Sequence, residues 1–321
     1  MSGKASHEDN LPATEVQGIS AADAWVHLFF GEATDTGCRI YAERERQSEA
    51  NAALCGFIRG PFCAYAQTLP INHPFRAASG KVSQRSESSQ QDAGANLIEV
   101  WVPDPCFWTP AMPYLYQYTL EREVAGQRQR ISGQIGIRRL GCAGDNLRFD
   151  GKRWVLRGAS LDKLRPDDVG AWHGAAMAAI LPRNATLPRA SERGVLIVSD
   201  LSGASDVEAE LRRLRSEPCV GMVILERENA PLSPRSWARN LLFAQRFRAG
   251  ETVRVDDWAD VAICELAGQT PAPPAVEGRS VPLVAWRAGG HGLLPEAGRA
   301  LCDRLQRDLA ASGINWAGYI V

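Results

Sequence analysis

The chain has 321 residues, of which 45% are hydrophobic and 23% charged, and its formal net charge at pH 7 is -1. This length is enough for one large or two ordinary domains. The balanced charge argues against a protein-wide field that would recruit nucleic acid or an acidic membrane surface. We therefore expect a soluble globular protein that binds neither nucleic acids nor membranes.

The amino-terminal stretch MSGKASHEDNLPATEVQGIS lacks the apolar core of a signal peptide. No later run approaches the roughly 18 apolar residues that a membrane-spanning helix needs. The sequence therefore predicts a cytoplasmic protein with a disordered segment over residues 1–19. The eight cysteines are scattered, without a CxxC pair or a Cys/His cluster at metal spacing. We expect reduced, mostly buried thiols, no metal and no cofactor.

Residues 20–145 contain short runs rich in aromatic and β-branched residues, separated by turn signals. Examples are AWVHLFFGEA, NLIEVWVP and YLYQYTLERE. This pattern is typical of an antiparallel β-sandwich. The polar stretch over residues 77–96 is too hydrophilic to pack and is predicted to form a mobile loop.

Beyond residue 150 the pattern becomes strand followed by helix. Eight apolar runs suit a parallel sheet covered on both faces: WVLRGAS, MAAILP, GVLIVSD, VGMVILE, TVRV, VAICELA, PLVAWRA and WAGYIV. One helix is expected after a capping box formed by Ser205 and Glu208, and another between Pro295 and Gly313. Eight strands with intervening helices predict a compact (β/α)8 barrel over residues 150–321.

The junction between the two halves carries family-specific motifs. It reads FWTPAMPYLYQYTLERE, then GQIGIRRL, then LRFDGKRWVLRGASLDK. This resembles glycoside hydrolase family 2, in which such motifs join an immunoglobulin-like β-sandwich to a catalytic (β/α)8 TIM barrel. The matching residues are Trp108, Pro113, Tyr114, Leu115, Tyr116, Gly136, Arg138, Gly151, Lys152 and Gly158. The resemblance implies that fold and a retaining mechanism, which needs two carboxyl groups about 5 to 5.5 Å apart at the strand ends.

The family's acid/base glutamate ends a motif of the form HPSVI.WS.GNE after strand four. Aligned on Pro218, that glutamate falls on Glu228, while the preceding asparagine becomes Arg227. An arginine beside a general acid favours its ionised form, which cannot donate a proton. Glu228 is therefore a surviving acid/base residue, a solvated loop glutamate, or the ion-pair partner of a nearby arginine.

The family's nucleophile ends strand seven in a motif of the form kPii.tEyG. Here the sequence is VPLVAWRAGG, and Arg287 falls at the position of the glutamate. A guanidinium has no lone pair to offer an anomeric carbon, so the resemblance predicts an inactivated site. We expect Arg287, Glu228 and Asp200 to converge at the barrel mouth, with Arg287 paired to Glu228. Because side chains alternate along a strand, only one of Arg287 and Trp286 can face the mouth.

Four further residues are candidates for substrate binding: Asp200, Glu265, Trp286 and His291. Asp200 ends strand three, as an acidic residue does in the family, but it could equally begin a loop. Glu265 is either a relocated nucleophile or a packed, paired glutamate. Trp286 could stack on a sugar ring, and His291 lies in a glycine-rich segment after strand seven. The histidine of the family's Rt.H.P motif after strand two is missing from AILPRNATLP.

Two functions fit these observations. The first is a catalytically degenerate glycoside hydrolase family 2-like protein, retained as a scaffold that binds a carbohydrate or another protein. The second is an active retaining β-glycosidase with Glu228 as acid/base and Glu265 or Asp200 as its partner. The departures at the nucleophile, at the asparagine and at the strand-two histidine favour the first.

Overall fold

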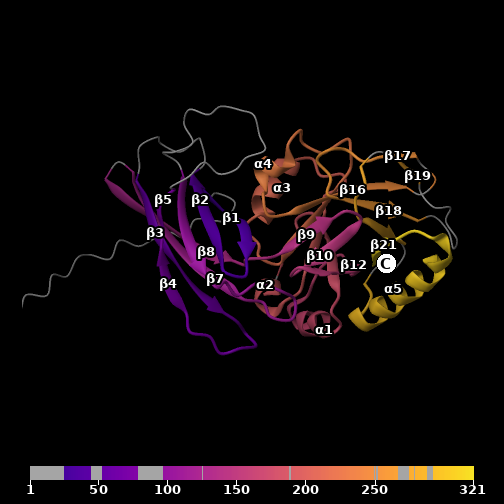
Figure 1. The fold of residues 1–321 in the computed structure, drawn as a ribbon, viewed down its shortest axis with the longest axis horizontal. Helices are drawn as coiled ribbons and strands as arrows, with labels where there is room; N and C mark the ends of the chain where they lie inside the picture. Colours follow the sequence, from indigo (N-terminus) through magenta and orange to yellow (C-terminus); the bar gives the residue numbers. More distant parts are fainter. Residues whose placement is uncertain are drawn as a thin grey trace, which may run out of the picture.

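The protein consists of a β-sandwich and a closed barrel joined by a small hairpin sheet (Figure 1). This computed structural model describes residues 25–44, 53–78, 97–124, 126–187, 189–248, 250, 252–266, 275–277, 279–287 and 292–321. The predicted disordered segment 1–19 and most of the predicted polar loop 77–96 lie outside these residues, as does His291.

The sandwich has two antiparallel sheets of four strands each, as the alternating runs predicted. One sheet has the order β1-β2-β6-β5, formed by Val26–Thr34, Gly37–Arg44, Leu97–Pro103 and Arg76–Ala77. The other has the order β4-β3-β7-β8, formed by Ile71–Pro74, Leu54–Phe62, Leu115–Val124 and Gln127–Ile135.

The core of the sandwich follows from strand alternation. In β2, Cys38, Ile40 and Ala42 are fully buried, whereas the side chains between them face outward. Ile58 and Leu120 are the corresponding fully buried residues of the opposite sheet. The two inner faces thus form one hydrophobic core of the aligned-sandwich type.

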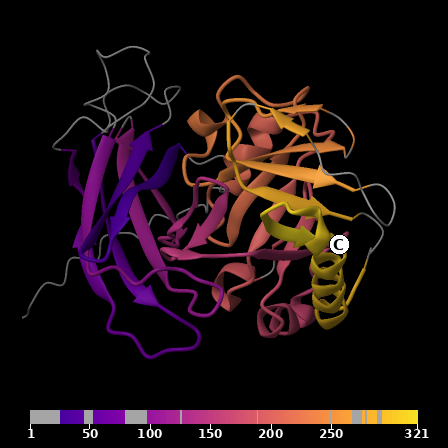
Figure 2. The same cartoon turned by 45° about the vertical axis from the view of Figure 1, so that its right-hand side comes forward.

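A three-stranded antiparallel sheet lies between the sandwich and the barrel, as Figures 1 and 2 show. Its strands β9, β10 and β11 are formed by Leu140–Ala143, Asn146–Phe149 and Lys152–Arg153. Asp150 and Gly151 connect the last two strands with φ angles of 52° and 74°, a left-handed turn that glycine and aspartate tolerate. Leu140 reaches Gly221 at the base of the barrel, where a Cβ on that glycine would lie 2.8 Å from the leucine side chain.

The barrel closes with eight parallel strands in the order β12-β13-β14-β15-β16-β18-β20-β21, and β21 pairs with β12. This confirms the predicted architecture of an immunoglobulin-like sandwich followed by a (β/α)8 barrel, with WAGYIV as the last strand. The barrel strands are Leu156–Ser160, Ala178–Pro182, Ile197–Asp200, Val220–Leu225, Leu242–Arg248, Val261–Glu265, Leu283–Trp286 and Trp316–Ile320.

The fifth barrel strand differs from the prediction. The run TVRV was expected to form it, but the barrel uses β16, with the sequence LFAQRFR, between β15 and β18. Strand β17 (Thr252–Arg254) instead pairs with β19 (Ala275–Glu277) in a separate two-stranded sheet. The polar residues Gln245 and Arg246 interrupt the apolar run of β16, so the sequence pattern did not reveal this strand.

Most helices around the barrel are short. The set comprises η2 (Pro166–Asp168), α1 (Val169–Gly174), α2 (Ala190–Arg193), α3 (Val207–Leu214), α4 (Pro234–Trp237), α5 (Pro295–Leu309) and η3 (Ala310–Ser312). Helix α3 is capped by Asp206, which accepts a hydrogen bond from the backbone N–H of Ala209, and not by the predicted Ser205. Helix α5 begins at Pro295 as predicted, and the chain turns at Gly313 with φ 70°.

Candidate functional site

The long helix α5 shows which side chains face the inside of the barrel. It packs on β12 and β21, where Asp303 of α5 binds Arg157 at 3.0 Å, so Arg157 faces outward and Gly158 inward. Paired residues on parallel neighbours share a face. The pairing of Gly158 with Ile320, of Ile320 with Trp286 and of Trp286 with Glu265 therefore places the tryptophan and the glutamate inside.

A charged cluster fills the inside of the barrel at the carboxyl ends of the strands. Arg246 of β16 donates to Glu265 of β18 over 3.0 Å and to Asp200 of β14 over 3.4 Å. The side chains of Arg246, Asp200 and Glu265 are 22%, 20% and 23% exposed. Arg246 also reaches the Ser202 hydroxyl at 3.4 Å, and the backbone N–H of Ser202 donates to Asp200 over 2.9 Å.

Trp286 completes this cluster from β20. The Arg246 guanidinium carbon lies 4.8 Å from the centre of the Trp286 ring, within range of a cation–π contact. Trp286 is 7% exposed, and its buried indole N–H has no hydrogen-bond partner among the described residues. We call Asp200, Arg246, Glu265 and Trp286 the mouth cluster.

The mouth cluster unites three of the predicted substrate-binding residues around a residue that sequence reasoning missed. Asp200, Glu265 and Trp286 come from different strands, and Arg246 contacts all three. Arg246 was overlooked because its strand was not predicted. The only signal in the sequence was a pair of polar residues inside the apolar run LLFAQRF.

Glu228 is not part of this cluster and lies in a solvated turn. Strand β15 ends at Leu225, and the turn that follows is closed by Asn229, whose side chain bonds the Glu226 N–H and the Leu201 carbonyl at 3.0 and 2.9 Å. Glu228 is exposed in this turn. Its neighbour Arg227 points to Asp256, at 2.9 Å. The hydrogen bond with Asp256, and to a smaller extent the charge of Glu228, raise the pKa of Arg227.

Arg287 does not face the mouth, contrary to the expectation that it would meet Glu228 there. Its guanidinium binds Asp308 of α5 at 2.8 Å, on the outside of the barrel. The reason is the alternation of β20: Trp286 faces inward, so the next residue must face the helices. The position that aligns with the family's nucleophile thus carries an arginine directed away from the site.

His291 lies outside the described residues, so its position relative to the mouth cluster stays a prediction. Within the described part of the chain, no three His, Cys, Asp or Glu side chains gather as a metal site would require. No helix there is both long and apolar enough to cross a membrane.

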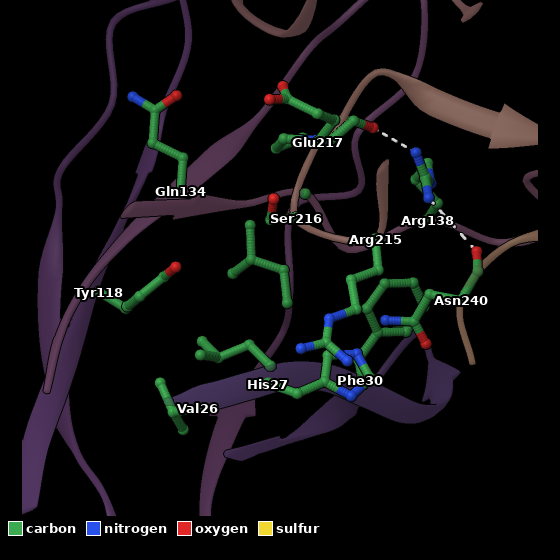
Figure 3. A pocket seen from close by; sticks show the side chains of 14 residues that line it. Val26, His27, Phe30, Tyr118, Gln134, Arg138, Arg215, Ser216, Glu217 and Asn240 are labelled. Atoms are coloured by element: carbon green, nitrogen blue, oxygen red, sulfur yellow. Dashed lines mark hydrogen bonds between the residues drawn. The ribbon is translucent and has the colours of Figure 1, made fainter. Parts of the chain in front are cut away.

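A second group of charged side chains lies at the base of the barrel, where the sandwich contacts it. Figure 3 shows strands β1 and β7 of the sandwich facing residues 215–218 and Asn240 of the barrel. Arg138 bridges this contact by donating to the backbone carbonyls of Pro218 and Asn240. Arg138 is 6% exposed, and burial lowers the pKa of its guanidinium to about 10.

The titratable groups of this junction are shifted by burial. Burial, followed by the charges of Arg215 and Arg239, lowers the pKa of His27 well below its ordinary 6.5. Burial raises the pKa of Glu217, against the opposing charge of Arg213. These shifts favour the neutral forms of both side chains. The junction therefore behaves as an interior and not as a solvated surface.

No protein-family model matches the chain, and no curated protein matches it in sequence. Solved structures do match. An FMN-binding β-glucuronidase from Facaelibacterium prausnitzii L2-6 superposes with a TM-score of 0.56 at 11% identity over 92% of this chain and 55% of that one. A glycosyl hydrolase family 2 member from Bacteroides cellulosilyticus DSM 14838 gives 0.55 at 11% identity, over 93% and 45%. A β-glycosidase from Bacteroides vulgatus gives 0.53 at 9% identity, over 82% and 38%.

These similarities confirm, at the level of the fold, the resemblance to glycoside hydrolase family 2 that the junction motifs predicted. The identities of 9% to 11% match the predicted divergence. The chain spans roughly half or less of the length of these three structures. Over the part that matches, its fold is similar to the folds of these glycoside hydrolases.

Proposed function

We propose that this protein is a catalytically degenerate relative of the glycoside hydrolases, whose barrel mouth binds a carbohydrate or another protein without cleaving it. The observation that carries this proposal is the position of Arg246 between Asp200 and Glu265. Both carboxylates are held by the same guanidinium, so neither is free to act as nucleophile or proton donor.

The requirements of retaining hydrolysis support this proposal. That chemistry needs two carboxyl groups about 5 to 5.5 Å apart, one to attack the sugar and one to transfer a proton. Glu228 is exposed in a turn, and Arg287 points to Asp308 outside the barrel. The family's two catalytic positions thus provide no carboxylate pair facing each other across the mouth.

The polar groups of the mouth cluster are suited to binding. Carboxylate oxygens accept hydrogen bonds, guanidinium N–H groups donate them, and an aromatic side chain offers apolar surface, the mixture that recognises a sugar. The buried indole N–H of Trp286 has no partner among the described residues, and a small movement of the mouth side chains would let a ligand hydroxyl accept a hydrogen bond from it. These features support a ligand that contacts Trp286 and the charged trio together.

The test is an assay of purified protein with aryl β-glucuronides, β-galactosides and β-mannosides. We expect no release of the aryl group above the rate of a protein-free control. The alternative, an active β-glycosidase, requires turnover that disappears in Glu228→Gln and persists in the control Glu192→Gln, a surface glutamate of α2. Such a result would overturn the proposal.

Binding is tested separately by calorimetric titration of the corresponding free sugars. We expect Trp286→Phe, which removes the indole N–H but keeps an aromatic ring, to weaken binding by about tenfold, the cost of one lost hydrogen bond in a buried site. A sugar that binds the wild type and this variant equally would bind somewhere other than the mouth cluster.

A further inference from the structure

A second cleft, separate from the mouth, lies where the sandwich, the β9-β10-β11 sheet and the base of the barrel meet. Its volume is about 450 Å³, within the range of about 300 to 1,000 Å³ typical of small-molecule sites. Figures 1 and 2 show β9 and β10 between the sandwich and the barrel. The mouth cluster occupies the carboxyl ends of the strands, whereas this cleft borders Leu241, directly before β16 begins.

The lining of this cleft is strongly basic. It contains the four arginines Arg138, Arg139, Arg148 and Arg239, and none of the described residues that line it is acidic. Several glycines line it as well, among them Gly141 of β9, where a Cβ would meet nothing within 4 Å. The cleft therefore combines guanidinium groups with backbone that a ligand can approach closely.

Two of these arginines are fixed by carboxylates that do not line the cleft. Arg139 binds Asp150 and Asp35. Arg239 binds Glu43 at 2.9 Å and lies 4.2 Å from the centre of the Phe29 ring. Such contacts orient the guanidinium groups in advance, which lowers the cost of binding a ligand.

The other two arginines have no carboxylate partner among the described residues. Arg138 is almost fully buried and donates only to backbone carbonyls, and its Nε has no partner in the described part of the chain. Arg148 is exposed and donates over 2.9 Å to the Gly151 carbonyl, so its guanidinium retains further N–H groups for a ligand. The carboxylates that bind the cleft arginines are Asp35, Asp150 and Glu43. Because these three negative charges are set against four guanidinium groups, the cleft has an excess of positive charge.

We propose that this cleft binds a small anion, the phosphate or sulfate ester of a sugar-sized molecule. Phosphate and sulfate oxygens match the forked donors of arginine, and such charge-assisted bonds are the strongest that a partly exposed cleft can offer. The bound ester would join Arg239 of the barrel to Arg148 of β10. This inference does not depend on the proposed function of the mouth.

The test is calorimetric titration of the full chain at constant ionic strength with glucose 6-phosphate, glucose 6-sulfate and unmodified glucose. We expect one saturable site for at least one ester and none for glucose. Whether the phosphate or the sulfate binds more tightly shows which of the two esters the cleft prefers. The proposal fails if neither ester binds, or if glucose binds as tightly as its esters.

A pair of substitutions of equal size locates the site. Gly141 pairs directly with Arg148 across β9 and β10, and its open surroundings accept a side chain. Gly141→Asp places a negative charge in the cleft and should weaken ester binding by about tenfold or more, because like charges are repelled where the ligand sits. Gly141→Asn has nearly the same shape without the charge and should stay within about twofold of the wild type. Equal effects of the two substitutions, or no effect of Gly141→Asp, would overturn the proposal.

A second variant checks the result on the arginine side. Arg148→Gln removes an exposed guanidinium and should weaken ester binding, whereas Arg128→Gln, an exposed arginine of β8, should leave it unchanged. Unchanged binding in Arg148→Gln would contradict the assignment even if Gly141→Asp failed to fold.

Discussion

The two ends of the barrel use arginine in opposite ways. At the mouth, Arg246 is partly exposed and shared by two carboxylates. At the base, Arg138 is buried, and within the described part of the chain it donates only to backbone carbonyls of the segments that precede β15 and β16. Burying a charge without a counterion costs desolvation free energy, which hydrogen bonds to the charged group can offset. The base arginine therefore holds domains together, whereas the mouth arginine holds two carboxylates in place.

The largest effect should come from Arg138→Met, which keeps the apolar length of the side chain but removes its donors. The carbonyls of Pro218 and Asn240 would lose a partner at a buried contact. We expect the free energy of unfolding to fall by about 3 kcal/mol. Chemical denaturation measures this change. A loss below about 1 kcal/mol would mean that Arg138 stabilises the protein no more than the partly exposed Arg246 does.

The pH dependence of stability should report the buried His27. Because its pKa is lowered, His27 stays neutral in the folded protein at a pH below 6.5, where the same histidine in the unfolded chain becomes protonated. His27 thus contributes no pH dependence above 6.5, and stability is lost as the pH falls from 6.5 toward the folded pKa. One such group can change the free energy of unfolding by at most about 1.4 kcal/mol per pH unit.

Denaturation of His27→Gln between pH 8 and 5 tests this expectation. The variant should lack the loss below pH 6.5, while His73→Gln, at a more exposed histidine, should retain most of it. Groups facing His27 include Arg215, Arg239, Glu217 and Tyr118. Glu217, with its raised pKa, acts in the opposite sense, since its contribution is lost as the pH rises above 4.5 through the folded value. An identical slope in the wild type and His27→Gln would contradict a buried neutral histidine.

Arg246→Met, the same substitution at the mouth, should cost less than Arg138→Met. It leaves Asp200 and Glu265 unpaired but partly in contact with water, so we expect a loss of about 1 kcal/mol. The same variant should remain inactive toward aryl β-glycosides, because freeing the carboxylates does not restore the family's positions. Hydrolysis by Arg246→Met would mean that Arg246 alone blocks an otherwise complete site.

Arg287→Glu should have the smallest effect, and it should not create activity. The new carboxylate would face Asp308 of α5 outside the barrel, where like charges repel, so the melting temperature should fall slightly below that of Arg287→Gln. Aryl glycoside turnover by Arg287→Glu would show that residue 287 can reach the mouth after all.

Features that depend on local patterns could be predicted from the amino-acid sequence. Alternation along strands such as β2 predicted the sandwich, and the junction motifs predicted how it meets the barrel. Pro295 marked the start of helix α5, because its fixed φ suits a first helical turn, and Gly313 marked the turn after it, because glycine tolerates a positive φ. The rule that only one of Trp286 and Arg287 can face inward was also available from alternation alone.

Which of these two residues faces inward, and which side chains it contacts there, became clear from the folded structure alone. The register of β20 against its neighbours determines which of its side chains point into the barrel. That register is set when the whole barrel closes. The sequence pattern did not reveal Arg246, because a polar residue in a strand interrupts the apolar run by which the strand is identified. Its contacts with Asp200 and Glu265 join residues 46 and 19 positions apart. No local pattern encodes such contacts, since they exist only once the strands that carry them lie side by side.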